Sequence, residues 1–259
     1  TERMITMGED VPGNPIARAV MQLMDIVGVN YGNDSEYASL RAAYPEFKIY
    51  GSETTSALSS RGIYARDDIN LQCSSKDNDF VGWGDSASEA LKRHMNSDYL
   101  AGMFVWTGFD YIGEPTPFNK YPARSSYFGI IDLAGFPKDI YYMYQSRWTK
   151  KPMIHVFPHW NWGNGNTVNV WLYSNCDKVE LFVNGISKGI KTKDSIGHKY
   201  NYEYNVLYEA GTLLAKGMDS EGNVLVQEEI KTSSTPYKIY LTSDKSLIKQ
   251  GGDDLIFVE

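Results

Sequence analysis

Three features are scarce or missing in this sequence, and each absence excludes a class of protein. Only two of the 259 residues are cysteines, Cys73 and Cys176, and neither has the C-x-x-C or Cys/His spacing of a metal site or a disulfide framework. No apolar run approaches the roughly 20 residues that span a bilayer, and no basic stretch followed by an apolar one opens the chain. Lys and Arg number 25 against 32 Asp and Glu and form no block. We therefore expect lone thiols and neither a membrane span nor a nucleic-acid partner.

Aromatic side chains are the abundant feature. They make up 14% of the chain, with 19 tyrosines and 6 tryptophans, and 42% of all residues are hydrophobic. Flat rings stack on the faces of sugars, and their polar edges can bind hydroxyl groups. Rings also fill the cores of β-sandwiches, so composition leaves both interpretations open.

The first 148 residues alternate short apolar strands with helical patterns. Asn14, followed by Pro15, is typical of a helix start, and so is Asp34; Ser86 and Glu89 form a capping box. The apolar series Ile16, Ala19, Val20, Leu23 and Met24 follows the first of these starts. The expected strands are Arg3–Met7, Ile26–Asn30, Phe47–Gly51 and Leu100–Trp106, and the expected helices follow Asn14, run from Asp34 to Ala43, run from Ser86 to about Asn96, and cover Pro137–Trp148.

Four consecutive strand–helix units predict a parallel sheet with helical crossovers. Four units are half of a (β/α)8 barrel, which typically needs ~250 residues. The alternatives are an open four-stranded sheet and a barrel whose N-terminal half is absent. The chain begins at Thr1 and enters a strand almost at once, which favours truncation. We assign residues 1–150 to the C-terminal half of a barrel.

From Lys151 the hydrophobic period changes to two, which predicts an all-β region. Asn184-Gly185 between two apolar runs predicts a tight hairpin. We expect an immunoglobulin-like β-sandwich over residues 151–235, and the start of a further, truncated β-domain over 236–259, with a strand at Tyr237–Thr242. The expected sandwich strands are Met153–Phe157, Thr167–Tyr173, Lys178–Val183, Tyr200–Val206, Gly211–Met218 and Asn223–Ile230.

Candidate catalytic groups follow the predicted strands. Reactive groups of (β/α)8 enzymes lie at the carboxyl ends of strands, where this chain has Asn30-Tyr31, Glu53 and Trp106. A carboxylate can attack the anomeric carbon, a phenol can keep it ionised, and an indole can stack on the sugar. Taken singly, each has a simpler interpretation as a loop charge, a chance pair or a core residue.

Long contiguous motifs resemble glycoside hydrolase family 2, in particular β-galactosidase-type enzymes of Bacteroides-like bacteria. They are KIYGSETTSALSSRGIY (48–64), LAGMFVWTGFDYIGEPTPF (100–118) and ARSSYFGIIDLAGFPKDIYYMYQSRW (123–148). RMITMGED and IVGVNY resemble the fifth and sixth barrel strands of that family. The resemblance covers residues 1–235 and identifies the predicted sandwich with the domain that follows the barrel.

The resemblance implies roles for individual residues. Glu53, in GSETTS on the seventh strand, matches the nucleophile; Tyr31 matches a tyrosine near it, with Asn30 beside it in the same motif. Trp106 matches a tryptophan of the sugar platform on the eighth strand. Asp110 can take sugar hydroxyls as a substrate-binding residue or can order its loop through a salt bridge. The same two interpretations, contact with substrate or ordering of the loop, apply to Glu114 in the same loop and to Arg61 in SSRG.

The family's acid/base glutamate follows an asparagine on the fourth strand, and this chain contains no Asn-Glu pair. We therefore expect that residue upstream of Thr1, and no useful hydrolysis by the 259 residues alone. The implied function is exo-acting, retaining hydrolysis of β-galactosides, with β-glucuronides or β-mannosides as alternative substrates.

No organic cofactor motif is present, and the family's Mg²⁺ or Na⁺ ligands cannot be placed on this sequence. The resemblance favours a periplasmic or extracellular location. A competing hypothesis is a non-catalytic carbohydrate-binding or spacer module with a remnant barrel, whose binding residues would be Trp160, Trp162, Trp171, Tyr202 and Tyr204.

Overall fold

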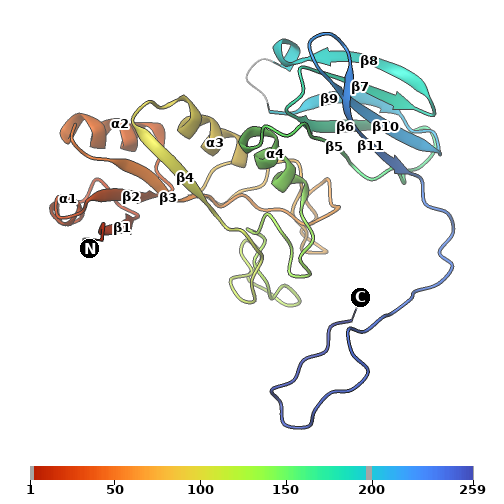
Figure 1. The fold of residues 1–259 in the computed structure, drawn as a ribbon. Helices are drawn as coiled ribbons and strands as arrows, with labels where there is room; N and C mark the ends of the chain where they lie inside the picture. The colour runs from red at the N-terminus through yellow and green to blue at the C-terminus, as the bar shows by residue number, and fades with distance from the viewer. Residues whose placement is uncertain (1–2, 197–199, 259) are drawn as a thin grey trace.

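The computed structural model describes residues 3–196 and 200–258 and contains a mixed α/β region followed by a β region (Figure 1). The first region alternates strands and helices in the order that the sequence predicts. Its elements are β1 (Thr6–Glu9), α1 (Pro15–Met21), β2 (Ile26–Asn30), α2 (Asp34–Ala43), β3 (Ile49–Thr55), α3 (Ala87–Asn96), β4 (Leu100–Trp106) and α4 (Asp139–Trp148).

The four strands form one parallel sheet in sequence order, β1-β2-β3-β4. Side chains of α1 and α2 pack on one face of it, where Met21 and Leu40 join Val27, Val29 and Ile49 in a buried cluster. The other face is open, and Phe104 on β4 is 66% exposed. Because parallel strands end at one edge, β2, β3 and β4 bring their last residues together there.

Element boundaries differ from expectation at several points. The first strand starts at Thr6, and α4 starts at Asp139, two residues after Pro137. The third strand runs from Ile49 to Thr55, so Glu53 lies within β3 instead of after a strand that ends at Gly51.

Two helix predictions need correction. The Asn33 side chain caps α2 in place of Asp34, because its Oδ1 accepts from the amides of Ser35 and Glu36, while Glu36 bonds back to the Asn33 amide. Asn14 caps α1 as predicted, but α1 ends at Met21, and Ile16 is 76% exposed. A helix of two turns buries whichever residues meet the sheet, and those are Ala17 and Met21.

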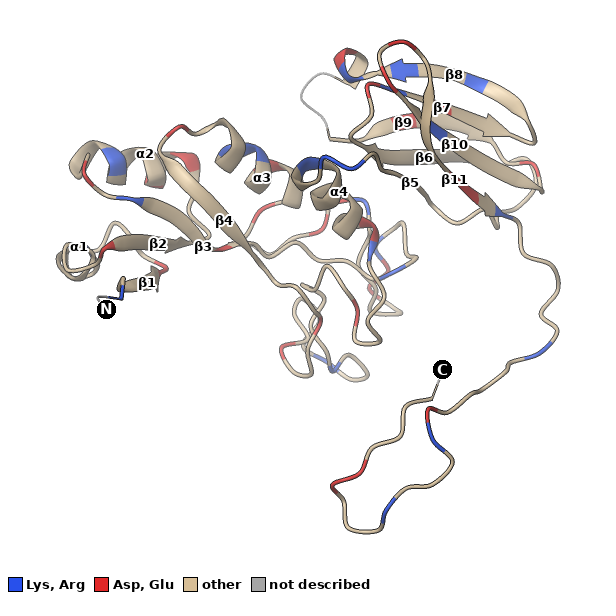
Figure 2. Ribbon diagram, in the orientation of Figure 1, with Lys and Arg blue, Asp and Glu red and all other residues tan. Residues whose placement is uncertain are grey.

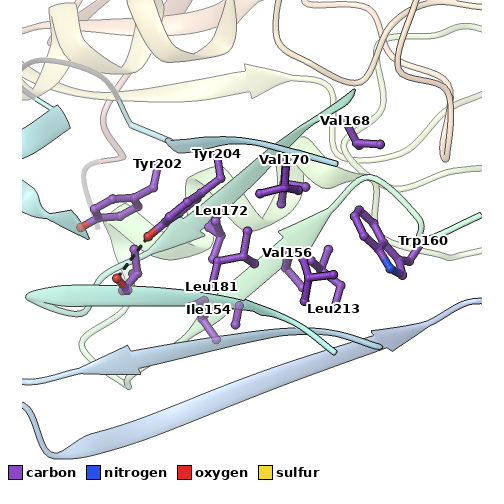
Figure 3. Packing of buried hydrophobic residues seen from close by; sticks show 14 of the residues in the cluster. Ile154, Val156, Trp160, Val168, Val170, Leu172, Leu181, Tyr202, Tyr204 and Leu213 are labelled. Carbon is purple, nitrogen blue, oxygen red and sulfur yellow. Dashed lines mark hydrogen bonds between the residues drawn. The ribbon is translucent and has the colours of Figure 1, made fainter. Parts of the chain in front are cut away.

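The second region is a sandwich of two antiparallel sheets around one core (Figure 3). One sheet has the order β11-β10-β7-β8 and the other β5-β6-β9. Asn184 and Gly185 both have positive φ, 50° and 79°, and join β7 to β8 in the predicted hairpin. The elements are β5 (Ile154–Phe157), β6 (Thr167–Ser174), β7 (Lys178–Val183), β8 (Ile186–Thr192), a 3-10 turn (Lys193–Ile196), β9 (Tyr202–Leu207), β10 (Thr212–Met218) and β11 (Val224–Lys231).

The expectation of a strand at Tyr237–Thr242 is wrong. After β11 the chain leaves the sandwich in an extended course (Figure 1), and within 236–258 its only strand-like pairing is an isolated bridge between Ser243 and Val258. Tyr237 is 93% exposed. An apolar run without a neighbouring strand has no partner for its backbone groups and forms no ladder.

The sandwich and the α/β region meet at α4. Met143 and Tyr144 of α4 share a buried cluster with Phe157 of β5 and Tyr173 of β6. Next to it the His155 imidazole lies between two carboxylates, with Nε2 2.8 Å from Asp139 Oδ1 of α4 and Nδ1 3.3 Å from Glu228 Oε1 of β11. One side chain therefore ties a helix to strands of both sheets.

The distribution of the charged residues and the state of the two cysteines agree with the sequence-based expectation. Lys and Arg are interspersed with Asp and Glu along both regions (Figure 2). Cys73 and Cys176 are free and buried. None of the helices among residues 3–196 and 200–258 is long and apolar enough to cross a membrane.

Candidate active site

Glu53 and Tyr31 are in direct contact at the carboxyl edge of the sheet. Asn30 and Glu53 are register partners on β2 and β3, and the Tyr31 amide donates to the Glu53 carbonyl oxygen at 2.7 Å. The Tyr31 hydroxyl donates to Glu53 Oε2 at 2.9 Å. The phenol thus fixes a half-buried carboxylate in one orientation, and Oε1 of Glu53 has no hydrogen-bond partner among residues 3–196 and 200–258.

Burial and the negative charge of Glu53 raise the pKa of Tyr31 above its ordinary value. The phenol therefore keeps its proton at neutral pH and acts as a donor. A hydrogen bond to the charged form of a carboxyl group stabilises that form. The pair therefore positions the Glu53 carboxylate through a donor that stays protonated.

Asn30 is held beside this pair. The Ser52 hydroxyl donates to Asn30 Oδ1 at 2.7 Å. Gly28 makes room for this contact, because a Cβ there would lie 2.7 Å from Ser52 Oγ and 2.5 Å from the Met7 carbonyl oxygen. The Asn30 amide NH2 has no partner among residues 3–196 and 200–258, which leaves it as a donor for a ligand hydroxyl.

The backbone around Glu53 is strained. Tyr31, Thr55 and Ser56 have φ of 54°, 82° and 51°, in the left-handed region that non-glycine residues rarely occupy. Each such residue costs on the order of 1–3 kcal/mol, and they cluster at functional sites. One of the three, Tyr31, belongs to the Tyr31–Glu53 pair, and the other two follow Glu53 closely in the chain, which independently marks this edge of the sheet.

Trp106 ends β4 next to the strand that carries Glu53, and it pairs with Thr55 in the register. Its ring meets the Tyr111 ring edge to face, with centroids 6.0 Å apart. The Tyr111 hydroxyl donates to Glu114, and burial together with this bond raises the pKa of Tyr111 to about 12. Glu114 therefore anchors Tyr111, whose ring packs against Trp106.

Asp110 forms an ion pair and a hydrogen bond that hold its loop in place. Its Oδ2 lies 2.7 Å from the ammonium of Lys138, which is only 1% exposed, and its Oδ1 accepts from the Gly129 amide at 2.8 Å. Lys138 also donates to the Ser59 carbonyl oxygen at 2.7 Å, so it links the loops after β3 and β4. Both carboxylate oxygens of Asp110 already have a partner within the chain, which favours the loop-ordering alternative over contact with substrate.

Arg61 also orders a loop, since its Nε lies 2.6 Å from Asp132 Oδ2.

Sequence reasoning missed Lys138, because a lone lysine before a helix carries no pattern. It also missed a pocket of about 170 Å³ beside Tyr31. Trp83, 54% exposed, and Arg93 are among its lining residues. No cluster of three metal-ligating side chains occurs in the described part of the chain.

Comparisons with known proteins cover nearly the whole chain. A family profile described as a domain of unknown function, DUF4982, matches residues 165–226 within the sandwich. A curated protein named β-galactosidase BoGH2A, from Bacteroides ovatus, is 42% identical over 99% of this chain and 32% of its own length. A putative β-glucuronidase of Formosa agariphila is 43% identical over 60% of this chain and 15% of its own length. The chain thus spans about a third or less of these relatives.

Solved structures have the same fold. A β-glycosidase from Bacteroides vulgatus superposes with a TM-score of 0.78 at 28% identity, over 98% of this chain and 40% of that one. A glycosyl hydrolase family 2 member from Bacteroides cellulosilyticus superposes with a TM-score of 0.71 at 23% identity, over 99% of this chain and 34% of that one. At 23% identity the second likeness concerns the fold alone.

Proposed function

We infer that this chain, which is similar over nearly its whole length to β-galactosidase-type proteins of glycoside hydrolase family 2, is the part of a retaining β-glycosidase that carries the catalytic nucleophile. The observation that supports this best is the contact between the Tyr31 hydroxyl and Glu53 at the carboxyl edge of a parallel sheet. The named relatives are glycosidases, and the geometry supplies one of the two carboxyl groups that such enzymes use.

We propose that β1–β4 are the second half of a (β/α)8 barrel. Three features support this. The strands are parallel and adjacent in sequence order, and helix side chains cover one face. The other face presents apolar side chains such as Tyr50 and Phe104, whose rings meet edge to face at 5.9 Å. A closed barrel would bury that face in its interior.

Glu53 would attack the anomeric carbon while a second carboxylic acid protonates the leaving oxygen, which gives a covalent glycosyl-enzyme. The same second group, now a base, would take a proton from water as it displaces Glu53, and net configuration is retained. Tyr31 would hold the Glu53 carboxylate in place, Asn30 would bind a hydroxyl and Trp106 would stack on the ring. A region outside these 259 residues would supply the acid/base.

A terminal β-galactoside is the proposed substrate, because the relative that matches 99% of this chain is named a β-galactosidase. β-Glucuronides are the main alternative, because other relatives carry that name. The long loops that distinguish such substrates differ within one architecture. Hydrolysis of matched aryl β-galactoside, β-glucuronide and β-mannoside by the natural protein that contains this chain ranks the three.

Azide rescue tests the role of Glu53. Glu53→Gly in the natural protein should abolish hydrolysis of an aryl β-galactoside. Added azide should then attack the anomeric carbon from the vacated side, expel the aryl oxide and give the α-glycosyl azide. Glu114→Gln is the matched control, because Glu114 also lies close enough to Tyr31 to affect its pKa. A β-configured azide product, or rescue of the Glu114 variant alone, would contradict the assignment.

The structure excludes most of the ligand-binding residues that the competing module hypothesis assigns. Trp160, Tyr202 and Tyr204 are in the sandwich core (Figure 3) and cannot stack on a ligand. Trp171 is half-buried, with Lys76 over its ring at 5.4 Å. Trp162 alone of the five is exposed.

A further inference from the structure

A groove of about 460 Å³ lies where the loop after β3 meets the sandwich. Its size is in the range of small-molecule sites. One wall is the segment 62–65 with Lys76, and the other is the segment 158–169, which joins β5 to β6. It shares no lining residue with the pocket beside Tyr31.

An aromatic platform forms part of the sandwich wall. The Trp162 indole stacks on the His159 imidazole, with centroids 4.9 Å apart and planes inclined by 17°. Its Nε1 donates to the His159 carbonyl oxygen at 2.7 Å, so the ring is fixed without a ligand. Tyr64 from the opposite wall meets His159 edge to face at 5.6 Å. His159 covers one face of the indole, and Trp162 as a whole is 36% exposed.

Hydrogen-bonding groups lie next to this platform. Asn166 and Thr167 are exposed, and within residues 3–196 and 200–258 their side chains have no hydrogen-bond partner. Two hydrogen bonds hold the backbone of Asn166. Its amide donates to the Gly163 carbonyl oxygen at 3.1 Å, and its carbonyl oxygen accepts from the Tyr208 amide at 2.8 Å. The groove therefore presents an amide and a hydroxyl from a fixed backbone.

The lining carries little net charge. It contains no carboxylate, and its ammonium group, on Lys76, bonds Asn169 at Oδ1 (2.9 Å) and at the carbonyl oxygen (3.0 Å). Burial lowers the pKa of His159, so the imidazole is neutral at pH 7. A fixed ring beside uncharged hydrogen-bonding groups fits a ligand that has an apolar face and many hydroxyls.

We propose that this groove is a second, non-catalytic binding site for a neutral saccharide, which stacks on Trp162 and bonds Asn166 and Thr167. The site would hold an oligosaccharide on the same protein that cleaves its end, but its binding does not depend on Glu53.

Binding can be read residue by residue in the 259-residue chain, labelled with ¹⁵N at its six tryptophans. The probes are β-linked tetrasaccharides of galactose, glucose and mannose, with an oligogalacturonate of equal length as the charged comparison. The Trp162 indole N–H signal is identified by its loss in Trp162→Phe. We expect this signal to shift with a neutral saccharide and Trp162→Ala to weaken binding by about tenfold or more.

Three further variants separate the possible results. Trp148→Ala removes another exposed tryptophan outside the groove and should bind normally. Glu53→Gln should also bind normally, since the groove is a separate site. Asn166→Ala should weaken binding by several-fold with an unchanged melting temperature. Trp162→Phe, which keeps a ring, should retain part of the affinity if Trp162→Ala fails to fold.

Other outcomes overturn the proposal. Shifts at Trp106 without shifts at Trp162, or binding lost in Glu53→Gln and kept in Trp162→Ala, would place the ligand at the Glu53 site. Tighter binding of the oligogalacturonate through Trp162 would exclude a neutral ligand. No shift of Trp162 with any of the probes would exclude the site, whatever the azide experiment shows for Glu53.

Discussion

The His155 cluster predicts a loss of stability in mild alkali. Burial alone would lower the pKa of this imidazole, but its hydrogen bonds with Asp139 and Glu228, and the charges of both, outweigh that effect and raise the pKa to about 9. The ring also stacks on Tyr142 at 3.8 Å and on Phe157 at 5.5 Å. Tyr64, Tyr142 and Tyr173, which also interact with Asp139, have raised pKa values and keep their protons in this range. His159, which interacts with Asp139 as well, has a pKa that burial lowers, so it stays neutral there.

The sign follows from the direction of the shift. A pKa that rises from 6.5 to about 9 on folding means that the charged imidazole stabilises the folded state. The full contribution, on the order of 3 kcal/mol, is present below pH 6.5, declines as the pH rises from there, and is lost above about pH 9. For a chain of this size it corresponds to a fall in melting temperature of roughly 6–12 °C.

Thermal unfolding between pH 6 and pH 10 measures this effect. His155→Gln keeps a hydrogen-bonding side chain that does not titrate, so its melting temperature should start lower and change little over the same interval. His159→Gln, outside the cluster, should keep the wild-type slope. The reasoning is refuted if His155→Gln loses as much stability as the wild type between pH 6.5 and pH 9, or if the wild type shows no loss.

Three further predictions concern the site and its loops. Lys138→Met leaves Asp110 charged and buried without its partner. The free energy of unfolding measured in urea titrations should therefore fall by about 3–5 kcal/mol, and the double variant with Asp110→Asn should recover part of this loss. Tyr31→Phe in the natural protein removes a bond to a charged group, and steady-state kinetics should show kcat lower by about 10- to 100-fold with the fold unchanged by circular dichroism. The 259-residue chain alone should release no more aryl oxide from an aryl β-galactoside than buffer does, and turnover that Glu53→Gln abolishes would contradict this.

Patterns within one segment predicted much of the fold. Strands β2, β4 and β7 have the expected bounds because each is a continuous or alternating apolar run between polar residues. The Asn184-Gly185 hairpin followed from two residues that tolerate positive φ. The contact between Tyr31 and Glu53 followed from one rule, that parallel strands end at a common edge.

Features that depend on distant partners could not be predicted in this way. Lys138 is buried because Asp110 and the Ser59 carbonyl oxygen come from two other loops. The His155 cluster joins residues that are 16 and 73 positions apart along the chain. No local pattern encodes such pairs, and the buried face of α1 likewise depends on the sheet beneath it.

The order of the parallel sheet has a consequence for how the chain is made. Each of β2, β3 and β4 pairs with the strand synthesised just before it, so the sheet can grow at one edge as the ribosome delivers the chain. The sandwich cannot, because β6 needs β9 and β7 needs β10. We expect the first region to gain protection from hydrogen exchange on stalled nascent chains that end before β9, and the sandwich to gain it only after β10 has emerged.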